Sequence, residues 1–171
     1  MPGDFPNMTM SQALLPEFDN EMKFTRKALE RVPDDKFDWK PHAKSMSLGR
    51  LAGHLAELVG FATAIIGTDG VNFDKGEYKP LVAKNRAEVL EAFDKNVAAT
   101  HEAIAGATDD HLRQPWHLIY QEKKLFEAPR AAALRSMAIN HIIHHRGQLT
   151  VYLRLNDVAV PSIYGPSADE M

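Results

Sequence analysis

The chain of 171 residues contains no cysteine, which excludes disulfides, thiolate metal ligands and a cysteine nucleophile. It also lacks a basic run: its net charge is −3, whereas proteins that bind nucleic acids usually carry a basic patch. No apolar stretch approaches the roughly 18 residues that cross a bilayer. The N-terminus also lacks the charged and apolar regions of a signal peptide. We therefore expect a cytoplasmic protein without nucleic-acid or membrane partners.

The composition is that of a globular protein with an apolar core. Hydrophobic residues make up 44% of the chain and charged residues 25%, which are ordinary fractions for such a protein. The length suits one domain. We expect a single domain over residues 1–171, with a loose N-terminal arm at residues 1–8 and a C-terminal tail at residues 158–171.

Four segments carry apolar residues at steps of three and four, the spacing typical of amphipathic helices. The first opens with a capping box from Thr9 to Gln12, and Pro16 marks either its start or a kink. Ser47 and Asn85 suit the N-caps of the second and third helices. We expect the helices over about residues 10–31, 47–67, 85–106 and 129–155.

The stretches between these helices are polar or irregular. Residues 34–46 and 68–84 are expected to form loops. Within residues 108–128, the short runs 118–120 and 124–126 suit a small hairpin. Four amphipathic helices without a larger sheet predict an all-α fold, a four-helix bundle.

Three of the eight histidines lie within five residues of the fourth helix: His141, His144 and His145. His141 and His145 are four apart, so their side chains lie one above the other on the helix surface. In H-E-x-x-H zinc helices this spacing lets two imidazoles bind one metal ion, although the glutamate of that motif is missing here. His54 lies in the middle of the apolar face of the second helix, where an aliphatic residue is expected.

A lone histidine on the inner face of a helix is more often a hydrogen-bonded core residue than a metal ligand. Three on two helices favour a metal site, because a buried imidazole without a partner costs a few kcal/mol and one ion satisfies all three. Bundles also place metal sites between facing helices. The pattern favours His54, His141 and His145. His144 competes, since it is also one turn from His141, but it projects away from His145.

Several motifs resemble the DinB/YfiT-like superfamily of metal-binding four-helix proteins. The matching motifs are Ser-Leu-Gly-Arg-Leu-Ala-x-His at residues 47–54, His-x-x-x-His-Arg-Gly-Gln-Leu at residues 141–149, Trp-Lys-Pro at residues 39–41 and Pro-Ser-Ile-Tyr-Gly-Pro at residues 161–166. The likeness covers about residues 10–169. It implies that His54, His141 and His145 bind the metal and that His144 does not. It also implies an up-down-down-up bundle that forms a homodimer.

Three histidine ligands leave a position open for water or substrate, as in catalytic sites. The resemblance implies a metal-dependent enzyme that acts on a small molecule, by thiol-dependent transfer or by hydrolysis. Any thiol must then come from solution as a cosubstrate, because the chain has none. Imidazole ligands suit several divalent metals: we expect zinc or nickel, with manganese or iron as alternatives. The competing hypotheses are a non-catalytic metal-binding or ligand-sensing module and a helical interaction protein with core histidines.

Three further residues are candidates for supporting roles near the metal. Gln148 lies one turn beyond His145, so it either orients water or a ligand or makes a buried polar contact. Glu57 lies one turn from His54 and suits a hydrogen-bond acceptor or a base, but an exposed, salt-bridging glutamate is the more common case. Tyr164 of the tail either closes over the site or packs beside it.

The other polar residues of the motifs have simpler interpretations. Arg146 binds a substrate anion or forms a structural ion pair. The remaining histidines are expected to be ordinary surface or loop residues: His42, His101, His111 and His117.

Overall fold

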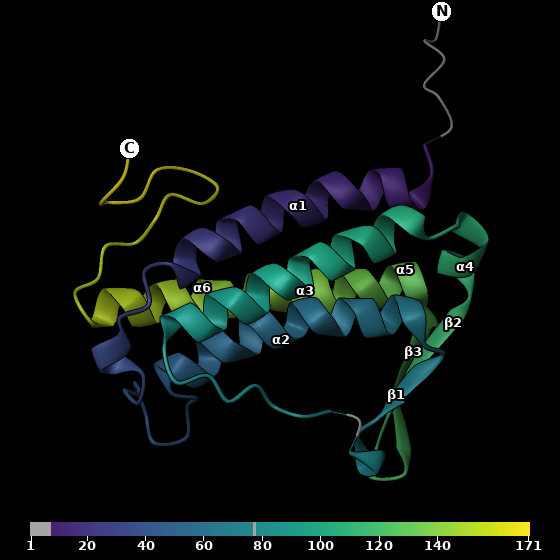
Figure 1. Cartoon of the computed structure of the whole chain (residues 1–171), viewed down its shortest axis with the longest axis horizontal. Coiled ribbons are helices and arrows are strands. Elements are labelled where there is room, and N and C mark those ends of the chain that lie inside the picture. The colour runs from purple at the N-terminus through teal and green to yellow at the C-terminus, as the bar shows by residue number, and fades with distance from the viewer. Residues whose placement is uncertain (1–7, 77) are drawn as a thin grey trace, which may run out of the picture.

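Four long helices lie side by side in the computed structural model, which describes residues 8–76 and 78–171 (Figure 1). Helices α2 and α3 run in one direction, and α1 and α6 run in the other (Figure 1), which is the expected up-down-down-up path. Neighbouring pairs around the bundle are α1 with α3, α3 with α2, α2 with α6, and α6 with α1. The four helices are α1 (Met10–Leu29), α2 (Leu48–Gly67), α3 (Arg86–Gly106) and α6 (Asn140–Leu155).

The helix starts follow the sequence signals. The Thr9 hydroxyl accepts from the backbone N–H of Gln12, and the Gln12 side chain accepts from the N–H of Thr9, so the predicted capping box is confirmed. Ser47 and Asn85 cap α2 and α3 through their side chains. Pro16 lies inside α1, so the alternative that the helix begins at this proline is wrong.

The core fills the space between the four long helices. Its largest fully buried apolar side chains include Phe18 of α1, Leu51 and Leu55 of α2, and Phe93 of α3. Burying each side chain of this kind contributes about 1.5–3 kcal/mol relative to leaving it in water. Because α2 packs against both α3 and α6, its residues face two neighbouring helices, and this places His54 beside α6.

The predicted fourth helix over residues 129–155 is continuous but not uniformly α-helical. It begins as α5 (Arg130–Ala133), passes through a π-helical segment, η3 (Leu134–Ile139), and continues as α6. A π-helical turn inserts one residue into the helical register and is frequent at functional sites. Here it ends just before His141, so it sets the direction in which the histidines of α6 project.

The expected all-α bundle with a small hairpin is confirmed only in part: the chain is mostly helical, but a three-stranded sheet adjoins one end of the bundle (Figure 1). Strands β2 (Pro115–Tyr120) and β3 (Lys123–Pro129) form the predicted hairpin, with longer strands than expected. Strand β1 (Gly70–Asn72) pairs with β2 in parallel, inside the stretch expected to be a loop. Short helices also interrupt the connections: η1 (Asp34–Lys36), η2 (Phe73–Lys75) and α4 (Asp109–Arg113).

Two local contacts explain how the sheet attaches to the connection after α2. The Asp74 carboxylate of η2 accepts from the backbone N–H groups of Gln121 and Glu122, each at 2.8 Å, at the hairpin turn. Gly70 lies against the His117 ring, where a Cβ atom would approach to 2.5 Å. A larger residue at position 70 would therefore require the His117 ring to move.

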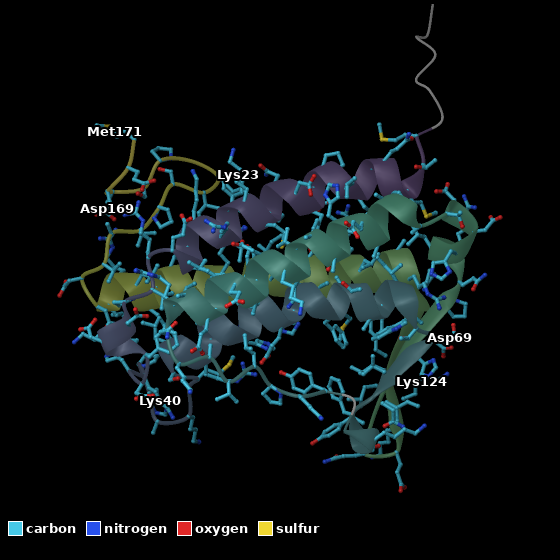
Figure 2. The ribbon with its side chains drawn as sticks, in the orientation of Figure 1. Lys23, Lys40, Asp69, Lys124, Asp169 and Met171 are labelled. Atoms are coloured by element: carbon cyan, nitrogen blue, oxygen red, sulfur yellow. The ribbon has the colours of Figure 1, made fainter. Side chains whose placement is uncertain are left out.

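The C-terminal end of the chain lies away from the sheet. Figure 2 shows Asp169 and Met171 at the opposite end of the bundle from Asp69 and Lys124. The tail, residues 158–171, has no helix or strand, and Glu170 ties it to the turn after α1 through an ion pair with Arg31 at 2.5 Å. Most of the predicted arm, residues 1–7, lies outside the described residues. Among the helices of the described part of the chain, none is long and apolar enough to cross a membrane.

Candidate metal centre

Three histidines converge between α2 and α6. One ring nitrogen from each of His54, His141 and His145 lies within 4.8 Å of the other two. The ring centroid of His54 is 5.5 Å from that of His141 and 4.8 Å from that of His145. The structure therefore brings together the three residues that the sequence favoured as metal ligands.

The outer nitrogens of these rings are held by neighbouring groups. Nδ1 of His54 lies 2.9 Å from Oε2 of Glu57, and Nδ1 of His145 lies 2.7 Å from Oε1 of Gln148. The carboxylate and the amide oxygen are acceptors, so each Nδ1 carries the proton and donates. The ring of His141 bonds to the backbone carbonyl of Met137 in η3. Metal-binding histidines are usually held in this way through their second nitrogen.

The inner nitrogens fit a metal ion. Nε2 of His145 lies 3.0 Å from Nε2 of His141. A neutral His145 that donates through Nδ1 presents a lone pair at Nε2. The rings of His54 and His141 lie beside the ring of His145. A divalent cation bound by the three rings would satisfy these lone pairs together. The donor set, three imidazoles without a thiolate, suits zinc, nickel, iron or copper in their divalent states.

The protonation of the rings agrees with this role. Burial is the main cause that lowers the pKa of the His145 imidazole to about 4; the nearby rings of His54 and His141 also lower it, and the hydrogen bond to Gln148 opposes them. Burial is also the main cause that lowers the pKa of His141. Both rings are consequently neutral at pH 7, which is the form that binds metals.

Glu57 is buried and fully engaged, so the expectation of an exposed glutamate is wrong. Its side chain is 8% exposed. Besides His54, its Oε2 accepts from Nη2 of Arg50 at 2.9 Å and from the Tyr78 hydroxyl at 2.7 Å, and its Oε1 accepts from the Leu81 N–H. Burial alone would raise the pKa of Glu57, but these donors outweigh it and lower the pKa to about 2. Glu57 thus joins a histidine of the cluster to the loop after β1.

A cavity of about 730 Å³ opens beside the histidines. His54 and His141 form part of its wall, together with Glu57. The rest comes from α2, α3, η2, β2, η3 and residues 78–82 of the loop. Its other lining residues are Leu58, Gly60, Phe61, Ala64, Phe73, Tyr78, Lys79, Pro80, Leu81, Val82, Ala92, Asn96, Leu118 and Met137. A molecule in this cavity would reach the histidines directly.

Tyr164 does not join this wall. Its hydroxyl donates to Oε2 of Glu21 at 2.7 Å and accepts from Nη2 of Arg146 at 2.6 Å, and its ring packs against Phe24 of α1. Arg146 is in turn buried against α1. Of the alternatives for these two residues, the contacts match packing for Tyr164 and a structural ion pair for Arg146.

The remaining histidines lie outside the donor cluster. His144 is exposed, and its ring lies 4.9 Å from that of His145. His101 bonds to Asp19 and His111 bonds to the carbonyl of Ile66, while His117 packs on Gly70. His42 accepts from the N–H of Lys44 in an exposed loop. These contacts suit surface and structural roles.

The sequence did not single out Arg50, Tyr78 or Met137 as parts of the site. Arg50 lies two turns before Glu57 on the same face of α2. A buried Glu57 needs a cationic partner, so this spacing could have indicated Arg50. Tyr78 lies in an aperiodic loop and carried no signal in the sequence pattern. Met137 lies four residues before His141 on the same predicted helical face, but it was interpreted as core filler.

Comparison with known proteins agrees with this architecture. The model of the DinB family matches residues 8–171. The uncharacterized protein YrdA of Bacillus subtilis strain 168 is 28% identical over 157 residues, covering 91% of this chain and 89% of that protein. Crystal structures of two DinB-like proteins share the fold. One, from Bacillus cereus ATCC 10987, has a TM-score of 0.68 at 24% identity and covers 93% of this chain and 100% of its own. The other, YjoA from Bacillus subtilis, has a TM-score of 0.70 at 20% identity. The match covers 90% of this chain and 99% of YjoA.

The family model spans both histidine motifs and all four long helices. The fold, the position of the histidine cluster between α2 and α6, and this match all agree with the resemblance noted in the sequence. The chain belongs to the DinB family.

Proposed function

We propose that this protein is a metal-dependent enzyme that acts on a small molecule. The observation that carries the proposal is that His54 and His141 belong both to the donor cluster and to the wall of the cavity. A site that only stabilised the fold would normally carry four protein ligands and be closed. Here two of the three donors, His54 and His141, face a space large enough for a substrate.

His54, His141 and His145 would hold the ion. When bound there, a divalent metal supplies Lewis acidity and lowers the pKa of a water or thiol ligand. The chain's own residues orient the rings and exclude water from one side of the site. Glu57 and Gln148 act as positioning residues, because their acceptor oxygens are bonded to His54 and His145. Tyr164 has no part in this proposal.

The chemistry is either thiol-dependent transfer or hydrolysis. In the first, a low-molecular-weight thiol such as glutathione, bacillithiol or mycothiol enters as cosubstrate; its sulfur forms a bond to an electrophilic carbon, the bond from that carbon to a leaving group breaks, and the leaving group departs with the thiol proton. In the second, water attacks an ester or related bond. The absence of cysteine means that the sulfur in the first route must come from solution. We favour zinc or nickel as the resident metal, with manganese or iron as alternatives.

A substrate screen tests the proposal. The metal-loaded protein should turn over members of a panel of electrophiles and esters, and the metal-free protein should not. Turnover that requires an added thiol selects transfer, and turnover without thiol selects hydrolysis. If the fully loaded protein turns over no compound of a broad panel, the enzyme proposal fails and a metal-binding or ligand-sensing module takes its place.

Glu57→Gln is expected to lower metal affinity about 10- to 100-fold, the effect of losing a partner that supports a metal ligand. The amide keeps the size of the carboxylate but loses its charge and one acceptor oxygen. Isothermal titration with the metal alone measures the change. Glu88→Gln is the matched control, because Glu88 also accepts from a backbone N–H, that of Lys84, but lies outside the histidine cluster. It should leave metal affinity unchanged. Equal affinities of wild type and Glu57→Gln would contradict the positioning role.

We also propose that the protein forms a homodimer and is cytoplasmic. The homodimer is inferred from the family resemblance, and the location is inferred from the composition. Light scattering at micromolar concentration tests the assembly, and a mass near 19.1 kDa, that of one chain, would contradict the dimer.

A further inference from the structure

We propose that the cavity beside the histidines binds an uncharged small molecule with an aromatic or alkyl body, whose reactive group lies at the histidine end. The inference deepens the proposed function and rests on it only for the reaction at that end. The apolar character of the ligand follows from the cavity wall itself. Three observations carry it: the chemistry of the lining, the engagement of its polar groups, and its charge.

The lining is mostly carbon. Aliphatic side chains come from α2, the loop and β2, among them Leu58, Leu81 and Leu118. Aromatic rings form a connected wall: the Phe61 and Phe73 rings lie 6.4 Å apart, and those of Phe73 and Tyr78 lie 5.2 Å apart. Rings that support one another in this way are held in place before a ligand arrives. Such a wall favours flat or flexible apolar groups over polar ones.

Away from the histidines, the carboxylate of Glu57 and the NH2 group of Asn96 are already bonded within the protein. The Glu57 carboxylate accepts from His54, Arg50, Tyr78 and the Leu81 N–H. The Asn96 amide donates to the carbonyl of Ala56 at 2.9 Å. A polar ligand would therefore lose its bonds to water without gaining equivalent partners, at a cost of about 1–3 kcal/mol per group.

The charges around the cavity also disfavour an ionic ligand. The negative charge of Glu57 is balanced by Arg50, whose Nη2 lies 2.9 Å from it. Lys79 contributes to the wall but is exposed to solvent, so its charge lies at the rim. Among the described lining residues, no lysine or arginine lies in the apolar interior of the cavity, where it could stabilise an anion. Burying an unpaired charge there is costly.

The size of the cavity sets the scale of the ligand. A volume of about 730 Å³ falls within the range of roughly 300–1,000 Å³ that holds drug-sized molecules. Within a homologous series, each additional CH₂ group that enters the cavity should strengthen binding by up to about fourfold. The histidines occupy one side of this space, so a long apolar body can extend away from them towards Phe73.

The uncharged fluorescent probe N-phenyl-1-naphthylamine tests the inference on the full chain. The probe should bind both metal-loaded and metal-free protein, and linear alcohols should displace it more strongly as their chain lengthens. Ala92→Phe fills part of the cavity from α3 and should weaken probe binding at least about tenfold, which is about 1.4 kcal/mol. Ala98→Phe makes the same change on the exposed side of α3 and should leave binding unchanged.

The outcomes separate this inference from the proposed function. Retained metal binding in Ala92→Phe shows that the variant is folded, so a loss of probe binding supports the cavity. Failure of the wild type to bind the probe, or equal binding by Ala92→Phe and wild type, overturns the inference. Probe binding without any metal-dependent turnover supports the apolar cavity while the enzyme proposal fails.

Discussion

Replacing His141 by alanine is expected to lower metal affinity by more than about 100-fold, so that the purified variant retains little metal. Loss of a supporting partner alone costs about 10- to 100-fold, and His141 is a ligand itself in this site. His54→Ala and His145→Ala should have the same effect, because each removes one of three donors that lie within 4.8 Å of one another. Elemental analysis and isothermal titration with zinc or nickel measure the loss.

His144→Ala is the matched control for this series. His144 lies on the same helix, and its ring is 4.9 Å from that of His145, but it is exposed and outside the donor cluster. It should retain full metal content. Wild type should also gain about 2.7 kcal/mol of stability at metal concentrations about 100 times the Kd, and His141→Ala should lose this gain. Full metal content in His141→Ala would rule out the site described above.

The helices and the three-histidine cluster were predictable because both depend on periodicity. The capping box at Thr9 and the N-caps at Ser47 and Asn85 mark helix starts by local hydrogen bonding, which needs no knowledge of the rest of the fold. The pairing of His141 with His145 follows from the geometry of one helix. Even the choice of His54 came from its position within an apolar face, which had to turn towards the other helices.

The features that were missed depend on contacts between distant segments. Strand β1 has three residues, too few to show an alternating pattern, and its partner β2 lies beyond α3 in the chain. The burial of Glu57 likewise depends on the loop that carries Tyr78, whose path no local pattern encodes. On an isolated α2, Glu57 has the sequence context of a surface glutamate.

The candidate role of Tyr164 shows a further limit of sequence reasoning. The sequence left open whether it closes over the site or packs beside it, and the structure bonds its hydroxyl to Glu21 and Arg146. Arg146 directly follows His145, and adjacent residues of a helix project about 100° apart, so the two face different neighbours. One stretch of α6 therefore serves the metal centre on one side and the packing against α1 on the other.

Arg146→Met is expected to destabilise the metal-free protein by about 3–5 kcal/mol, the cost of breaking a buried ion pair from one side. The guanidinium is 2% exposed and lies 2.7 Å from the Glu21 carboxylate. It also donates to the backbone carbonyl of Glu21 and to the hydroxyls of Thr25 and Tyr164. Removing it leaves a carboxylate that is only 8% exposed without its cationic partner. Urea denaturation of the metal-free proteins measures the difference.

Arg135→Met provides the matched control, because Arg135 also links the last helix to α1, through an ion pair with Glu17 at 2.5 Å. That pair is exposed, with 54% of the arginine side chain and 32% of the glutamate accessible, so its loss should cost less than about 1 kcal/mol. Replacing Glu21 by Met in the Arg146→Met background should recover part of the stability, since no unpaired charge then remains buried. If Arg146→Met and Arg135→Met lower the free energy of unfolding equally, burial of the Arg146–Glu21 pair does not determine how much the pair contributes to stability.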